Sequence, residues 1–130
     1  MEEDVSMKII NWHNCESYPV HGEAIEQALI GNQSDALNQG PKPPKLPCAK
    51  GFVFFNHAVL DPKKTLEIHT GAFEEIYYVI SGRGSFVLDD KEYPINDGDA
   101  VFVPEGVRHG MTNGGSIPIE YLVTGSKISL

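Results

Sequence analysis

The residues best suited to chemistry in this chain lie between positions 98 and 113, where one histidine follows a tight turn. Gly98 suits a turn that needs a positive φ, and the residues after it have the alternation of a strand. Pro104 and Gly106 predict a second, tighter corner, at which the chain reverses before His109. This corner fixes the His109 imidazole at a defined point on the following strand, where it could bind a metal ion.

The spacing of this segment is also that of a known motif. It matches G-x5-P-x-G-x2-H-x3-N, the second motif of the cupin superfamily, through Gly98, Pro104, Gly106, His109 and Asn113. Five residue types at fixed offsets are hard to obtain by chance. The chain therefore resembles a small cupin with a single domain.

The first cupin motif, G-x5-H-x-H-x3-E-x6-G, is matched only in part. His69 stands at its first histidine, Glu75 at its glutamate and Gly82 at its closing glycine. Lys63 replaces the opening glycine, and Gly71 occupies the place of the second histidine. The resemblance still implies the cupin fold, but one of the four usual metal ligands is missing.

The resemblance implies that His69, Glu75 and His109 converge inside the barrel and hold one divalent metal ion. Two imidazoles and one carboxylate are the ligands of the facial triad that binds non-haem Fe(II), and they also suit Zn, Mn or Ni. Because Gly71 offers no ligand, a cupin without metal, with a hydrogen-bonded His and Glu, stays open. Glu67, which strand alternation places on the His69 face, is a candidate fourth ligand or pocket acid.

Several other side chains are candidates for the pocket. Glu67 and Tyr77 could transfer protons, and the expected substrate-binding residues are His57, Tyr77, Phe102 and Met111. Each of these also fits an ordinary place in a hydrophobic core. His57 could replace the imidazole missing from the first motif only if its face of the strand points inward.

The remaining polar candidates are expected to lie outside the pocket. His13 and His21 belong to the N-terminal segment and are predicted to be exposed. Arg83 and Arg108 flank the motifs and are expected to be rim charges, with binding of a substrate carboxylate as the alternative. Asn113 is expected to support the turn that follows it.

From residue 51 onward the sequence predicts an all-β unit, since short apolar stretches alternate with Gly, Pro, Asn and Asp. Such a pattern indicates a sandwich or barrel, and the motifs make residues 51–130 a double-stranded β-helix, the jelly-roll barrel of cupins. The expected strands are 52–60, 65–69, 75–81, 84–88, 92–95, 99–103, 107–112 and 118–124.

Residues 1–50 are predicted to be an irregular N-terminal segment. Residues 8–11 have the pattern of a short strand, whereas 23–30 favour a helix by residue type and a strand by family resemblance. Residues 41–47 predict a stiff polyproline arm, with a proline-rich ligand motif as the less favoured interpretation.

Length and charge exclude several classes of protein. The 130 residues suffice for one domain, and no apolar run is long enough for a membrane span. A formal charge of −8 with ten scattered Lys and Arg argues against binding to nucleic acid or anionic membrane. The acidic N-terminus is unlike a secretory signal, so Cys15 and Cys48 are expected to be reduced thiols of a cytoplasmic protein.

Three functions are compatible with these residues. The first is a metal-dependent enzyme for a small organic molecule, with oxygenase-type chemistry expected from the ligand set. The second is a module that binds a sugar or small metabolite without turnover. The third is a metal-independent isomerase or epimerase, with His69 or His109 as base and Tyr77 as acid. The family resemblance also implies a homodimer, for which the apolar strand 52–60 could supply the contact.

Overall fold

The structure is a computed structural model that describes residues 9–34, 37 and 47–127. Within these ranges nearly all regular elements are strands, which confirms the all-β prediction, and no described helix is long and apolar enough to cross a membrane. The elements are the 3-10 turn η2 (Trp12–Asn14) and the strands β1 (Ser17–Val20), β2 (Ala24–Asn32), β3 (Cys48–Ala49), β4 (Phe52–Leu60), β5 (Thr65–His69), β6 (Glu74–Ser81), β7 (Gly84–Leu88), β8 (Lys91–Ile95), β9 (Ala100–Val103), β10 (His109–Thr112) and β11 (Ile119–Ser126).

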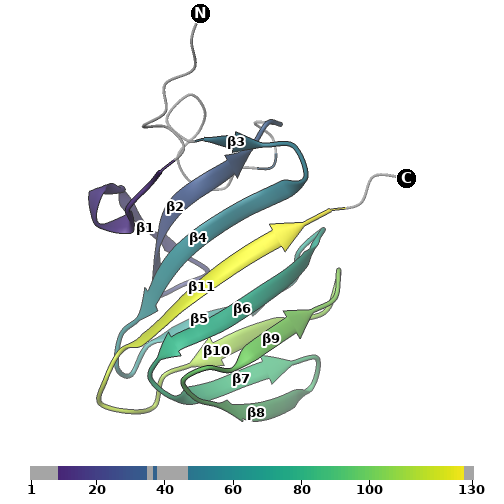
Figure 1. Cartoon of the computed structure of the whole chain (residues 1–130). Coiled ribbons are helices and arrows are strands. Elements are labelled where there is room, and N and C mark those ends of the chain that lie inside the picture. Colours follow the sequence, from purple (N-terminus) through teal and green to yellow (C-terminus); the bar gives the residue numbers. More distant parts are fainter. Residues whose placement is uncertain (1–8, 35–36, 38–46, 128–130) are drawn as a thin grey trace, which may run out of the picture.

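The strands form two sheets that face each other (Figure 1). The larger sheet has the order β1-β2-β4-β11-β6-β9, with β3 added in parallel beside β2, and the smaller has the order β5-β10-β7-β8. Strands far apart in sequence are neighbours in both sheets, as in a jelly roll. Residues before position 50 therefore contribute strands to the larger sheet.

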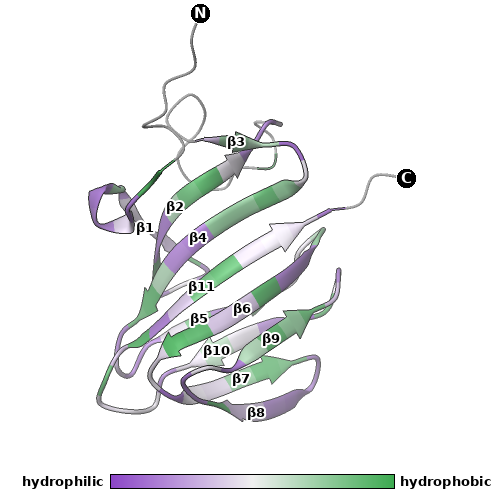
Figure 2. Cartoon of the chain, in the orientation of Figure 1, coloured by the Kyte–Doolittle hydropathy of each residue, from purple (hydrophilic) through white to green (hydrophobic). Residues whose placement is uncertain are grey.

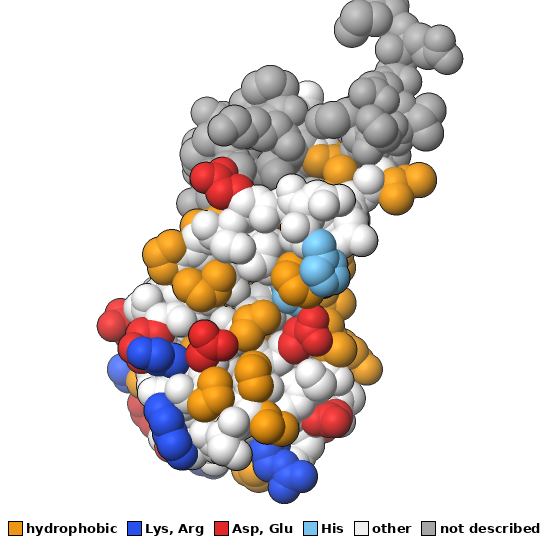
Figure 3. All heavy atoms as spheres, turned by 90° about the vertical axis from the view of Figure 1, so that its left-hand side faces the viewer, with side chains coloured by type: hydrophobic (Ala, Val, Ile, Leu, Met, Phe, Trp, Pro, Cys, Tyr) orange, Lys and Arg blue, Asp and Glu red, His pale blue; other side chains and the backbone are white. Residues whose placement is uncertain are grey.

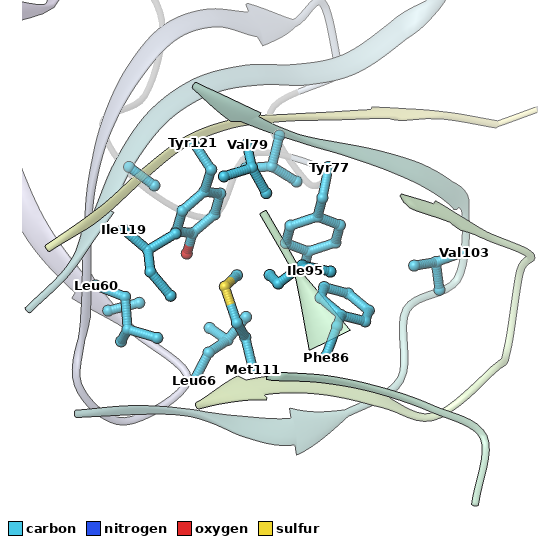
Figure 4. Close-up of a cluster of buried hydrophobic side chains, with 13 residues drawn as sticks. Leu60, Leu66, Tyr77, Val79, Phe86, Ile95, Val103, Met111, Ile119 and Tyr121 are labelled. Atoms are coloured by element: carbon cyan, nitrogen blue, oxygen red, sulfur yellow. The ribbon is translucent and has the colours of Figure 1, made fainter. Parts of the chain in front are cut away.

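The core lies between the two sheets and follows from strand alternation. Along β11 and most of β6, every second residue is buried, because successive side chains point to opposite faces. In Figure 2, hydrophobic and hydrophilic residues follow one another along the strands. Figure 4 shows the buried side chains pointing toward one another. The core residues are Ala24, Ala58, Leu60, Leu66, Tyr77, Val79, Phe86, Ile95, Val103, Met111, Ile119, Tyr121 and Val123.

The N-terminal segment differs from the prediction. The described residues 9–11 are not a strand, and the 3-10 turn follows because the Asn11 side chain accepts a hydrogen bond from the His13 backbone N–H at 2.9 Å. Residues 23–30 lie largely in β2, so the helical alternative is wrong: pairing with β1 and β4 outweighs the helix propensity. Apart from Pro47, the predicted arm at 41–47 lies outside the described residues.

A β-bulge in β5 decides which of its residues face the core. His69 pairs with His109, whereas Leu66 pairs with Met111, so β5 has one residue more than β10 over this stretch. The extra residue places Leu66 and His69 on the same, inward face. The expectation that His69 shares its face with Glu67 is therefore wrong.

Candidate metal centre

The structure brings together the three predicted metal ligands. His69 ends β5 and His109 begins β10, both in the smaller sheet, whereas Glu75 lies on β6 in the larger sheet. One candidate ligand atom from each lies within 4.8 Å of the other two. Glu75 and His109 are buried and His69 is half-buried, so the cluster faces the barrel interior.

Backbone carbonyls fix the tautomer of both histidines. His69 Nδ1 is 2.7 Å from the carbonyl oxygen of Glu67, and His109 Nδ1 is 2.9 Å from that of Val107. A carbonyl can only accept, so each Nδ1 carries the hydrogen and donates it. In the neutral rings both Nε2 atoms are then left with free lone pairs, which is how metal-binding histidines are usually oriented.

The contact between His109 and Glu75 has a separation that suits two ligands of one cation. Nε2 of His109 is 2.8 Å from Oε1 of Glu75, yet this buried nitrogen has no hydrogen-bond partner. With the hydrogen on Nδ1, both atoms of the close contact are acceptors in the neutral ring, so either Nε2 carries a second proton and forms an ion pair with Glu75, or the two atoms share a metal cation. Adjacent ligands that each lie about 2.1 Å from one ion are about 3 Å apart, so the separation suits a divalent metal.

Burial keeps His69 in its neutral, metal-binding form. Desolvation lowers the pKa of this imidazole to about 4, although its hydrogen bond to the Glu67 carbonyl opposes the decrease. The positive charge of a protonated His109 or His21 would lower the pKa further. His69 is therefore neutral in the metal-free protein at any pH well above 4.

Two of the predicted pocket residues face the same interior. Tyr77 is buried, and its hydroxyl lies 3.4 Å from Glu75 Oε1, to which it donates. Burial and the charge of Glu75 hold the pKa of Tyr77 well above its ordinary value, so the phenol keeps its proton. Met111 is also buried, and it points toward Tyr121 from the opposite sheet (Figure 4).

His57 does not point toward the cluster. Its neighbour Ala58 belongs to the core, so His57 lies on the outer face of the larger sheet. Its ring stacks on Trp12 at 3.8 Å and bonds Gln27 and Glu120, each at 2.6 Å. Its side chain is thereby fully engaged, and it cannot replace the missing imidazole of the first motif.

Phe102 and Glu67 also lie away from the cluster. Phe102 pairs with Ile76 on the outer face of β6 and β9 and is 54% exposed, so it lines a surface groove of about 390 Å³ and not the barrel interior. The Glu67 side chain is exposed and lies against Gly22, because the bulge turns it away from the face of His69.

The other polar predictions have clear positions. Asn113 is buried and donates to the carbonyls of Leu60 and Ile117 at 2.9 and 2.8 Å, while its oxygen accepts from Gly115 N–H, which supports the predicted structural role. Arg108 is exposed and 3.5 Å from Asp90. Arg83 and His13 are exposed as well.

Sequence reasoning missed His21, which was expected to be exposed. It is half-buried, and its ring stacks on that of His69 with centroids 3.4 Å apart and an 8° angle between planes. His21 lies in the turn between β1 and β2. Only the His-Gly pair at 21–22 hints at this turn, and nothing local places it beside β5.

Sequence reasoning also missed Glu26. It pairs with the core residue Ala58 and therefore faces the barrel interior, where Asn56 donates to its Oε1 at 2.8 Å. Burial raises its pKa to about 7; the hydrogen bond from Asn56 opposes this increase, and the charge of Glu75 adds to it. On the other side of Ala58, β11 places Tyr121 opposite this residue. The Tyr121 hydroxyl is buried without a hydrogen-bond partner among the described residues.

Fold and site together define a cupin. The family model described as Cupin domain matches residues 56–125, more than half of the chain, so the protein belongs to the cupin family. A crystal structure from Thermotoga maritima, described as a predicted oxalate decarboxylase, aligns with a TM-score of 0.74 and 19% identity over 92% of this chain and 99% of that one. This likeness confirms the jelly-roll fold.

Two curated relatives match parts of the chain. The oxalate-binding protein of Thermotoga maritima is 40% identical over 57 residues, which are 44% of this chain and 46% of that protein. The 5-aminosalicylate 1,2-dioxygenase of Comamonas sp is 30% identical over 96 residues, which are 74% of this chain and 24% of that protein. The matches span less than half the length of either relative.

Proposed function

We propose that this cupin binds one divalent metal ion through His69, Glu75 and His109 and acts on a small organic molecule at that ion. The gathering of the three ligand atoms within 4.8 Å carries the proposal, and the 2.8 Å approach of His109 Nε2 to Glu75 Oε1 supports it, because a metal ion would join two atoms that are both acceptors when His109 is neutral. Two imidazoles and one carboxylate favour Fe(II) with open positions, and Zn, Mn and Ni also accept such ligands. The likeness to a dioxygenase supports oxygenase-type chemistry.

Each residue around the cluster has a role in this proposal. The bound ion would polarise a carbonyl or activate dioxygen at its open positions. Tyr77 keeps its proton and can donate a hydrogen bond beside Glu75. Glu26, with a pKa near neutrality, is better placed to transfer protons than the exposed Glu67.

Elemental analysis of protein purified without chelator tests the metal site. We expect about one divalent ion per chain in the wild type, and its loss in the variants His109→Ala and Glu75→Gln. His13→Ala is the matched control, since it removes an exposed imidazole that lies beside Trp12. Metal content that is the same in His109→Ala as in the wild type would refute the proposed site.

A second candidate is a binding protein for a small carboxylic acid, without turnover. The oxalate-binding relative and the glycine at position 71 favour it. Thermal unfolding with oxalate and similar acids, measured in metal-loaded and metal-free protein, would show binding as a raised Tm. Mass spectrometry of the recovered acid then separates the two candidates, because only an enzyme changes the acid.

We also propose a homodimer that binds no nucleic acid or membrane. Large apolar side chains are exposed on the outer face of β6 and β9, namely Ile76, Tyr78 and Phe102, whereas β4 exposes Phe52. The face in Figure 3 carries Lys and Arg side chains interrupted by acidic ones, without a continuous basic surface. Light scattering after gel filtration should give a dimer mass, and the Ile76→Lys variant a monomer mass; a monomeric wild type would refute this.

The cytoplasm is the location we propose for the protein, where Cys15 and Cys48 would be reduced. Peptide mapping without reductant tests this state, and a Cys15–Cys48 disulfide would contradict it.

A further inference from the structure

His21 stands beside the metal cluster although it belongs to neither cupin motif. Its ring lies parallel to that of His69 with centroids 3.4 Å apart, and His69 in turn lies 4.2 Å from the ring of His109. The ring of His21 thus lies next to the cluster of His69, Glu75 and His109. The charges of Glu75 and His109 both act on His21, which places it within their electrostatic range.

The backbone holds His21 in this position at some conformational cost. His21 has a φ of +44°, a left-handed conformation that few residues with a side chain adopt. The carbonyl of His21 accepts the backbone N–H of Glu67 at 2.7 Å, and Gly22 forms a bridge with Leu66. These bonds join the turn between β1 and β2 to β5, across the gap between the two sheets. Strain of this kind is typical of functional positions.

Within the described part of the chain, no hydrogen bond engages either ring nitrogen of His21. Both nitrogens of the half-buried ring are therefore available to another partner. Two imidazoles on adjacent positions of one ion have nitrogens about 3 Å apart, so a stacked pair is already close to that arrangement. His21 lies outside the group of ligand atoms that are within 4.8 Å of one another, so its ring has to rotate to point a nitrogen at the ion.

We propose that His21 is the fourth metal ligand and supplies the imidazole that is absent at Gly71. This inference rests on the proposed metal site and deepens it. The ligand would come from the N-terminal hairpin and not from the first motif, so the ligand set regains three histidines and one glutamate. Coordination by His21 would also attach the hairpin of β1 and β2 to the ion.

Two measurements on the full chain test this role. Zn(II) affinity is measured by chelator competition, and the number of imidazoles on bound Cu(II) is counted by pulsed EPR. His21→Asn is the informative variant, because Asn tolerates the left-handed backbone and keeps the turn. We expect Cu(II) to lose one of three imidazoles, and the Kd for Zn(II) to rise about 10- to 100-fold. His13→Ala should leave both measurements unchanged.

A rescue variant separates ligation from mere support of the turn. A Cβ at Gly71 would lie 3.5 Å from the Phe73 ring, an ordinary contact, so a residue with a side chain can begin there without a clash at its Cβ. Gly71→His added to His21→Asn should restore the Zn(II) affinity if the missing imidazole is what matters. Equal affinity and equal imidazole counts in the wild type and His21→Asn would overturn the inference alone. A wild type that binds Zn(II) no better than His109→Ala would overturn the metal site itself.

Discussion

Replacing Glu26 by Gln should make the protein more stable at neutral and alkaline pH. Glu26 is 8% exposed, and burial raises its pKa from the ordinary 4.5 to about 7. In the folded protein its carboxyl therefore keeps its proton up to about pH 7, whereas in the unfolded chain it ionises above about 4.5. Unfolding releases a proton between these values, so the stability of the wild type decreases as pH rises through this window.

The size of the effect follows from the two pKa values. The difference between 4.5 and about 7 corresponds to about 3 kcal/mol, at 1.36 kcal/mol per pKa unit. Below about pH 4.5 Glu26 is protonated in both states, and Gln should then match it. Above pH 7 the full difference should favour Glu26→Gln, which still accepts the hydrogen bond from Asn56.

Urea unfolding of both proteins at pH 4.5 and pH 8, in the presence of chelator, measures this difference. The control is Glu16→Gln, an exposed position before β1, where we expect a change within about 0.5 kcal/mol at either pH. If Glu26→Gln is equally stable or less stable than the wild type at pH 8, then Glu26 is not buried as a neutral acid. Its proposed part in proton transfer would lose its basis.

Two further substitutions test how the loops and sheets are held. Asn113→Ala should cost about 2 to 4 kcal/mol in urea unfolding, because the buried carbonyl oxygen of Leu60 and the part-buried one of Ile117 lose their donor. A cost under about 0.5 kcal/mol would show that water replaces the amide. Gly84→Ala should cost about 1 to 3 kcal/mol in urea unfolding, because its Cβ would lie 2.5 Å from the carbonyl oxygen of Thr112. The control is Gly114→Ala, whose Cβ would meet nothing within 4 Å and which should leave the free energy of unfolding nearly unchanged.

The strands of the barrel were predictable because their signals are local. From residue 51 onward, alternation and turn residues placed every strand within about two residues of its observed ends. The hairpin of β7 and β8, for example, turns at Asp89, which has a φ of +61° and is of a type that tolerates it. Turn residues of this kind can be recognised in the sequence without knowledge of the tertiary structure.

The face of a residue was harder to predict than its strand. A single extra residue in β5 shifts the alternation of inward and outward side chains between Leu66 and His69. The sequence around Glu67 and Ile68 contains no Gly or Pro from which a bulge could be predicted. The motif spacing still identified His69 correctly as part of the cluster. Glu67 was assigned to the wrong face because regular alternation was assumed.

His21 and Glu26 were missed for a different reason. Both precede residue 50, and their neighbours at the site are at least 30 residues away in sequence. The position of Glu26 depends on the register of β2 against β4, in which Glu26 pairs with Ala58. The only local sign that this face of β2 points inward is the pair of small residues Ala24 and Ala28, two positions to either side of Glu26. Only the assembled sheets show that these residues approach the cluster.

Because the ligands come from both sheets, metal binding should stabilise the whole fold. His69 and His109 belong to the smaller sheet and Glu75 to the larger, so the unfolded chain has no comparable site. Zn(II) at 100 times its Kd should then add about 2.7 kcal/mol, which for a chain of this size raises Tm by about 10 °C. Calorimetry with and without Zn(II) measures the shift, and His109→Ala should abolish it. An equal shift in this variant would mean that Zn(II) acts elsewhere on the protein, and that the three side chains do not form the site that joins the sheets.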